Sequence, residues 1–92
     1  MAITVHFSPR GLDKSKYDEV MRRLERAGAG SPAGRLYHCC YESGGSLKVV
    51  DVYDSLQSFE QFGKTLAPIL ESLAIDAGQP EVSPAYNIVT GK

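Results

Sequence analysis

The fold of this chain is decided by residues 35–54, RLYHCCYESGGSLKVVDVYD. Residues 35–42 and 47–54 are rich in aromatic and β-branched side chains, which favour β-strands. Between them, Gly44-Gly45 can take the positive φ angles that a two-residue primed turn requires. The stretch therefore predicts a β-hairpin with its turn at Gly44-Gly45.

The turn also fixes which residues of the hairpin lie opposite one another. Ser43 pairs with Ser46, and counting outward places His38 opposite Asp51 and Leu36 opposite Tyr53. Successive side chains of a strand alternate between the two faces of the sheet. One face is then expected to carry Leu36, His38, Cys40, Val49, Asp51 and Tyr53. The other is expected to carry Tyr37, Cys39, Tyr41, Val50 and Val52, with Lys48 at its end.

Two further elements are predicted before the hairpin. Residues 2–7 alternate apolar and polar side chains, which is typical of a strand. Asp13 is a candidate helix N-cap, and apolar residues then recur at helical spacing from Tyr17 to Ala27. Gly28 is a natural end for this helix.

Two more elements are predicted after the hairpin. Ser55 can cap a second helix, whose apolar face runs from Leu56 to Leu73. Pro68 lies inside this pattern, and because proline lacks an N–H and clashes with the preceding turn, we expect a kink or a break near residues 63–65. Residues 81–90 predict a last strand, in which Pro84 suggests an edge position or a bulge.

The order β-α-β-β-α-β predicts a ferredoxin-like α+β sandwich, with a four-stranded antiparallel sheet and both helices on one face. A chain of 92 residues can bury one small core. We therefore expect a single domain over residues 1–92.

Helices on one face leave the other face of the hairpin uncovered. That face is mainly apolar and aromatic, and monomers rarely expose a large apolar patch. We expect a homodimer in which two sheets pack face to face about a two-fold axis, as a dimeric α/β barrel. The alternative is that these are ordinary scattered surface residues. The expected interface residues are Tyr37, Cys39, Tyr41, Val50 and Val52.

Composition disfavours several classes of protein. The net charge is −1, with 10 Lys and Arg against 11 Asp and Glu, and no basic stripe suggests a nucleic-acid partner. No apolar run reaches membrane length, and residues 1–7 do not resemble a signal peptide. Cys39 and Cys40 are adjacent and point to opposite faces, so an ordinary disulfide between them is not expected. We expect a cytoplasmic protein without a cofactor.

Residues 49–55, VVDVYDS, followed by FEQF at 59–62, resemble the dimeric α/β-barrel proteins, and among them the antibiotic-biosynthesis monooxygenase-like group. In that group a strand ends in an aromatic-acidic-serine step and leads into a helix with aromatic residues. The resemblance spans nearly the whole chain. It implies a ferredoxin-like fold and a dimer. Relatives include cofactor-independent oxygenases of phenolic polyketides, haem-degrading enzymes and muconolactone isomerases.

The resemblance carries over few catalytic residues. The monooxygenases hold substrate with an Asn on the third strand, a Trp at its end and a Tyr on the next helix. The corresponding residues here are Val49, Tyr53 and Phe59. The haem degraders ligate iron with a helical histidine, and residues 55–73 contain no histidine. The resemblance therefore implies the fold more strongly than an activity.

His38 and Asp51 are the candidate catalytic pair. A carboxylate that orients an imidazole makes a general base near neutral pH. The same two groups can also form a polar pair that satisfies itself inside a small domain, and both interpretations stay open. No cluster of three or four ligands suits a metal ion. The other expected lining residues of a ligand pocket are Tyr17, Leu36, Tyr53 and Phe59.

Three functions are compatible with these patterns. The first is a dimeric barrel that binds a small apolar or aromatic molecule. The second is a cofactor-independent monooxygenase or isomerase, in which His38 removes a phenolic or enolic proton from an aromatic or polyketide-like substrate. The third is an assembly module without a ligand. A pocket with converging polar groups favours the first two, and a filled core favours the third.

Overall fold

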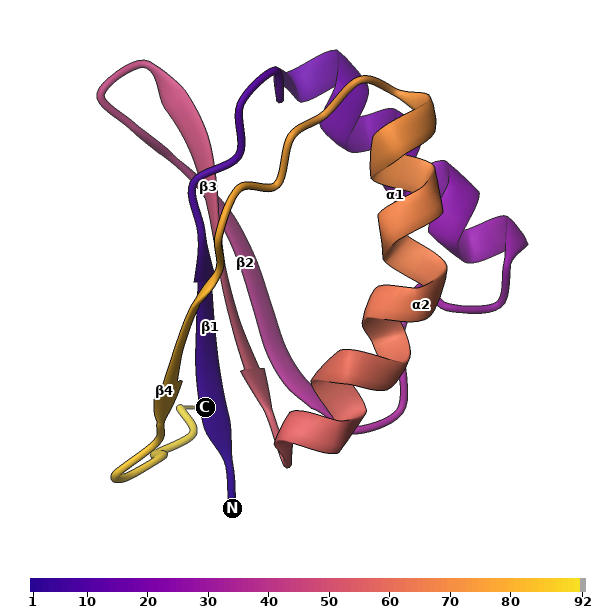
Figure 1. Ribbon diagram of the computed structural model, residues 1–92. Helices are drawn as coiled ribbons and strands as arrows, with labels where there is room; N and C mark the ends of the chain where they lie inside the picture. The colour runs from indigo at the N-terminus through magenta and orange to yellow at the C-terminus, as the bar shows by residue number, and fades with distance from the viewer. Residues whose placement is uncertain (92) are drawn as a thin grey trace.

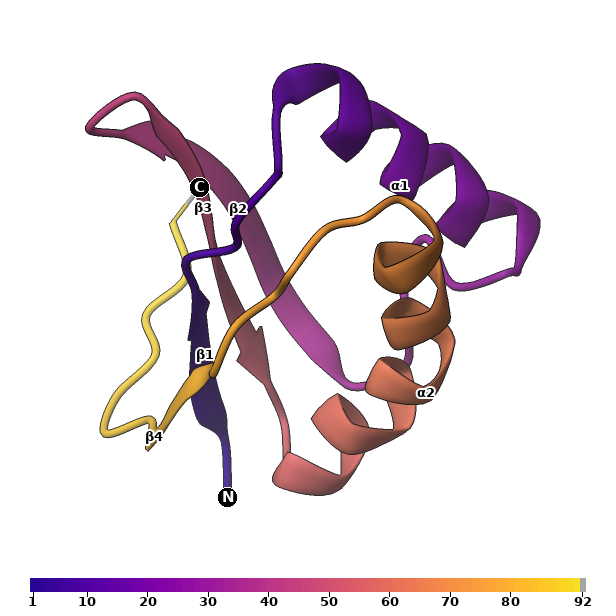
Figure 2. The same cartoon turned by 45° about the horizontal axis from the view of Figure 1, so that its top comes forward.

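The computed structural model describes residues 1–91 and has the predicted ferredoxin-like α+β topology (Figure 1). The sheet has the order β2-β3-β1-β4, and each neighbouring pair of strands is antiparallel. Both helices lie on one side of this sheet (Figures 1 and 2). The elements are β1 (Ile3–Phe7), α1 (Lys14–Arg26), β2 (Arg35–Ser43), β3 (Ser46–Tyr53), α2 (Leu56–Ser72) and β4 (Glu81–Pro84).

The β2–β3 hairpin has the predicted turn and the predicted register over most of its length. Gly44 and Gly45 have φ angles of 60° and 80°, which glycine adopts without strain. Ser43 pairs with Ser46, and His38 pairs with Asp51. The register that brings His38 to Asp51 is therefore confirmed.

The register changes at the start of β2, where the prediction for Leu36 is wrong. Arg35, and not Leu36, pairs with Tyr53, and a β-bulge lies between Arg35 and Tyr37. A bulge inserts one extra residue and reverses the alternation beyond it. Leu36 is consequently 57% exposed. Arg35 comes onto the same face as His38, toward the helices.

Both helices begin at the predicted caps. The Asp13 side chain accepts a hydrogen bond from the Lys16 N–H at 2.7 Å, and Ser55 accepts one from the Ser58 N–H at 3.1 Å. These bonds satisfy N–H groups that have no partner within the helix. The predicted break near residues 63–65 is wrong, because α2 runs without interruption through Pro68. Pro68 is exposed, so the carbonyl that loses its helical partner can hydrogen-bond to water.

Strand β4 is shorter than the ten residues predicted from sequence and ends at Pro84. Its partner β1 begins at Ile3, which pairs with Pro84, and the Ala85 N–H to Ala2 carbonyl bond is the last in the ladder. The paired part of β4 therefore ends opposite the first residue of β1. Pro84 lies at the sheet edge, as expected for a residue without an N–H.

The core lies between the sheet and the two helices. Neither helix of the described residues 1–91 has the length and apolar character of a transmembrane segment. Asp51 is a charged side chain buried beside this core, with 3% exposure. The buried apolar residues are Ile3, Val5, Val20, Leu24, Tyr53, Phe62 and Ile75.

Candidate functional site

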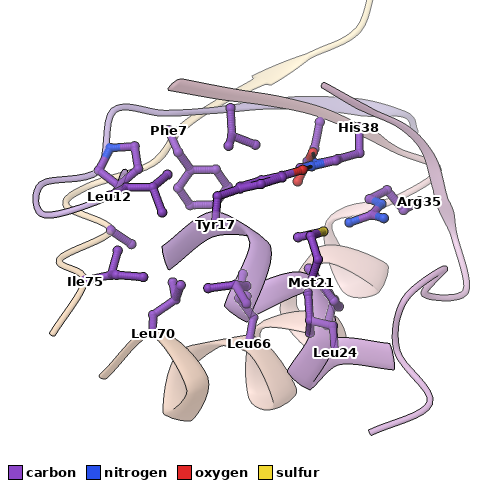
Figure 3. Close-up of a pocket in the computed structure, with 16 residues that line it drawn as sticks. Phe7, Leu12, Tyr17, Met21, Leu24, Arg35, His38, Leu66, Leu70 and Ile75 are labelled. Atoms are coloured by element: carbon purple, nitrogen blue, oxygen red, sulfur yellow. Dashed lines mark hydrogen bonds and ion pairs between the residues drawn. The ribbon is translucent and has the colours of Figure 1, made fainter. Parts of the chain in front are cut away.

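A cavity opens between the sheet and the helices, against the inner face of the β2–β3 hairpin (Figure 3). Its empty space is about 540 Å³ when the part open to solvent is included, so the enclosed interior is smaller. Most of the wall is apolar and comes from β1, both helices and the segment after α2. The polar side chains in the wall are Tyr17, Arg35, His38 and Asp51.

Three of these residues form a continuous hydrogen-bonded chain. The Tyr17 hydroxyl lies 2.6 Å from Nε2 of His38, and Nδ1 of His38 lies 2.6 Å from Oδ1 of Asp51. The planes of the Tyr17 and His38 rings are nearly parallel, with an interplanar angle of 2° (Figure 3). The Tyr53 hydroxyl extends the chain by donating to Oδ2 of Asp51 at 3.1 Å. The chain thus joins α1 to both strands of the hairpin.

Hydrogen-bonding capacity limits the direction of these bonds. A carboxylate at Asp51 only accepts, so Nδ1 of His38 donates to it, and Nε2 of a neutral imidazole then accepts from the Tyr17 O–H. Burial raises the pKa of Tyr17, and the carboxylate of Asp51 raises it further. Burial and Asp51 also raise the pKa of Tyr53. Both tyrosines therefore keep their protons at neutral pH and act as donors.

The hydrogen-bonded chain of Tyr17, His38 and Asp51 is partly enclosed. The side chain of His38 is 18% exposed and that of Asp51 is 4% exposed, so the imidazole is closer to solvent than its carboxylate. Within residues 1–91, no buried polar side-chain atom is left without a hydrogen-bond partner. The arrangement can stabilise the fold as a satisfied polar network. It can also pass a proton from the Tyr17 hydroxyl to His38, where Asp51 stabilises the imidazolium.

Arg35 is the residue that sequence reasoning missed. Its guanidinium carbon lies 5.4 Å from the centre of the Phe62 ring, and its Nη2 donates to the Gly30 carbonyl at 3.2 Å. Its positive charge opposes the rise in pKa of Tyr17 and Tyr53. Arg35 reaches the cavity only because of the bulge at Leu36, which an alternating pattern does not reveal.

Gly34 allows the backbone that leads into β2 to pass close to the start of α2. Its φ is 86°, and its carbonyl accepts a hydrogen bond from the Asp54 N–H at 2.8 Å. A Cβ at Gly34 would lie 2.2 Å from Oγ of Ser58, which is far inside contact distance. The close approach of this turn to the start of α2 therefore requires glycine.

We expect Gly34→Ala to destabilise the protein by about 2 kcal/mol, from the left-handed backbone and the steric conflict together. Gly28→Ala is the matched control, because Gly28 also has a left-handed φ, of 74°, while a Cβ there would meet no atom within 4 Å. Urea unfolding of both variants measures the difference. Equal losses would show that the contact with Ser58 does not matter.

The site residues expected from the sequence differ in where they lie relative to the cavity. The cavity wall brings together His38, Asp51 and Tyr17. Tyr53 reaches Asp51 through its hydroxyl, but its ring is fully buried and packs against Phe59, with the ring centres 5.3 Å apart. Phe59 lies in this aromatic core and outside the cavity wall.

Leu36 does not line the cavity, which corrects the sequence-based expectation. The bulge turns it outward and places Arg35 in the wall instead. Among residues 1–91, no group of three or more His, Cys, Asp or Glu side chains could hold a metal ion.

The outer face of the sheet carries no helix (Figure 2). On this face Val50 pairs with Cys39 on one side and with His6 on the other. Tyr37 is 58% exposed, and Tyr41 is hydrogen-bonded to Nε2 of His6. The apolar part of the face therefore lies over β2 and β3.

Comparison with known proteins gives matches in structure alone. No protein-family model and no curated protein sequence matches the chain. One match is a crystal structure from Chloroflexus aurantiacus J-10-fl, of a protein that carries the name antibiotic biosynthesis monooxygenase. Its TM-score is 0.64 at 14% identity, and the alignment covers 99% of this chain and 100% of that one.

Two other solved structures match over similar lengths. SnoaB from Streptomyces nogalater, named a cofactor-independent oxygenase, has a TM-score of 0.62 at 14% identity and covers 98% of this chain and 96% of its own. Rv0793 from Mycobacterium tuberculosis has a TM-score of 0.57 at 16% identity, with coverages of 99% and 97%. The chain thus shares its ferredoxin-like fold with the antibiotic-biosynthesis monooxygenase-like proteins, and at these identities the likeness concerns the fold.

Proposed function

We propose that the cavity binds a small apolar or aromatic molecule, with an ionisable hydroxyl of that molecule placed at the Tyr17–His38–Asp51 chain. The observation that carries the proposal is this chain of hydrogen bonds in the wall of an otherwise apolar cavity. Apolar cavities with a few converging polar groups are the usual form of small-molecule sites. The apolar wall would hold the body of the ligand, and the chain would orient its hydroxyl.

A cofactor-independent proton transfer is the second candidate function. A phenolic or enolic O–H that donates to the Tyr17 oxygen would give up its proton as Tyr17 passes its own to Nε2 of His38. The ligand becomes an anion, Tyr17 is neutral again, and His38 becomes an imidazolium held by Asp51. This relay is favoured by the two 2.6 Å contacts, which place His38 between a hydroxyl and a carboxylate. An electron-rich anion is the species that an isomerase or a cofactor-independent oxygenase needs.

Support for oxygenation itself comes from analogy with SnoaB, which shares the fold and is named as such an enzyme. The third candidate is an assembly module in which the chain is only a satisfied polar network. These candidates differ in what they require of the His38 side chain.

We expect His38→Gln to weaken binding of 2-naphthol by at least about tenfold while unfolding free energy changes by under about 1 kcal/mol. A glutamine amide has a donor that can serve Asp51 and an acceptor that can serve Tyr17, but it cannot take a proton, so the weaker binding would reflect the lost proton acceptor. The chain contains no Trp, so naphthol fluorescence can be titrated against a low protein background.

His6→Gln is the matched control, because His6 is also hydrogen-bonded to a tyrosine but lies on the outer face. It should leave naphthol binding unchanged. If the parent protein does not bind 2-naphthol, or if both variants weaken binding equally, the proposed site is wrong. A spectrum of bound naphtholate in the parent, absent in His38→Gln, would support the proton transfer.

A further inference from the structure

We propose that Arg35 makes the cavity prefer an anion, so that its best ligand is an aromatic or enolic carboxylate and neutral molecules of similar shape bind more weakly. This inference rests on the proposed function and specifies the class of ligand. It is carried by the contacts of the guanidinium, by the position of Arg35 in the wall, and by the chemistry of the wall around it.

Arg35 forms no direct ion pair with a carboxylate in the described part of the chain. The buried carboxylate of Asp51 already accepts from both His38 and Tyr53. Arg35 has five N–H donors; one of them is directed to the Gly30 carbonyl, and the guanidinium also lies beside the Tyr53 hydroxyl as a hydrogen-bonding neighbour. Donors therefore remain for a ligand.

The surroundings of the guanidinium favour an anionic ligand. One face of it is covered by the Phe62 ring, and the wall beyond is mainly apolar. A cation that is partly withdrawn from water is stabilised by a carboxylate, and a guanidinium can bind one through two parallel hydrogen bonds. The anion would also reduce the cost of holding this charge in a narrow cavity.

The position of Arg35 suggests how a ligand would lie. Figure 3 shows Arg35 and His38 on one part of the wall, with Leu66, Leu70 and Ile75 on another. A flat ligand would place its apolar body toward these three side chains. Its carboxylate would meet Arg35 while its hydroxyl meets Tyr17. A molecule with both groups on one conjugated system suits this arrangement.

The backbone holds Arg35 firmly at this point. The Arg35 N–H donates to the Pro32 carbonyl at 3.2 Å, and Arg35 pairs with Tyr53 next to the bulge. Bulges re-aim side chains at functional sites. Under this inference, the role of the bulge at the start of β2 is to direct the Arg35 side chain into the cavity.

The test compares 2-naphthoate with 2-naphthamide, which have the same ring system and differ in charge. We expect the parent protein to bind 2-naphthoate at least about tenfold more tightly than 2-naphthamide. Arg35→Gln should remove this preference by weakening the naphthoate alone, and Arg35→Lys should restore part of it. Arg26→Gln makes the same change in net charge at an exposed position on α1 and should alter neither affinity.

The failures of this inference and of the proposed function are distinguishable. Equal binding of the two probes to the parent, unchanged in Arg35→Gln, would overturn the anion preference and leave the cavity as a neutral binding site. Equal weakening of both probes in Arg35→Gln would show that Arg35 only supports Phe62 and the wall. Binding of neither probe to the parent would overturn both.

Discussion

Lysine in place of Val50 is expected to separate a homodimer into monomers. We propose that two copies pack through the uncovered face of the sheet, because its part over β2 and β3 is apolar. Val50 lies inside this face, between Cys39 on β2 and His6 on β1. A lysine there would be buried without a partner, at a cost of about 3–5 kcal/mol of association free energy, or a roughly 150- to 5,000-fold weaker dimer.

Sedimentation or light scattering at micromolar concentration measures this effect. The parent should have the mass of two chains and Val50→Lys the mass of one. Gln57→Lys is the charge-matched control, because Gln57 is exposed at the start of α2, on the other side of the sheet. Circular dichroism checks that the variant is folded. A parent with the mass of one chain, or a Val50→Lys protein that stays dimeric, would show that this face is not the interface.

Much of the fold could be predicted because one turn fixes many contacts. Gly44-Gly45 takes the positive φ angles of a two-residue primed turn, which most other residue pairs disfavour, and the register then follows by counting to His38 and Asp51. The polar pair at the centre of the site was visible for this reason. The helix caps Asp13 and Ser55 were also visible, since each signal is local in the sequence.

The remaining features depend on tertiary contacts. Both faces of the hairpin are largely apolar, so the pattern of apolar and polar residues looks the same with or without an extra residue in β2. The bulge at Leu36 could therefore not be predicted from it. Arg35 was missed with it. Strand β4 ends where its pairing with β1 ends, and the sequence of β4 does not show where β1 begins. The contact of Tyr17 with His38 depends on how α1 lies over the sheet, which helical spacing alone does not determine.

Replacing Asp51 by alanine is expected to be the most destabilising change in the site. Asp51 accepts from His38 through Oδ1 and from Tyr53 through Oδ2, and it is 3% exposed. Without it, two buried donors lose their acceptor, and each costs about 1–3 kcal/mol. We therefore expect Asp51→Ala to lower the unfolding free energy by about 2–6 kcal/mol, measured by urea unfolding.

Two further variants separate structure from function at Asp51. Adding Tyr53→Phe to Asp51→Ala should recover part of the stability, because it removes one of the unpaired donors; no recovery would mean that the Tyr53 hydroxyl finds another partner.

Asp51→Asn can still accept from His38, so it should cost only about 1 kcal/mol, but it removes the charge that stabilises an imidazolium. If Asp51→Asn stays folded and binds 2-naphthol without ionising it, the carboxylate acts on a proton. If Asp51→Asn ionises bound naphthol as the parent does, the carboxylate only completes the polar core, and the proton-transfer interpretation fails.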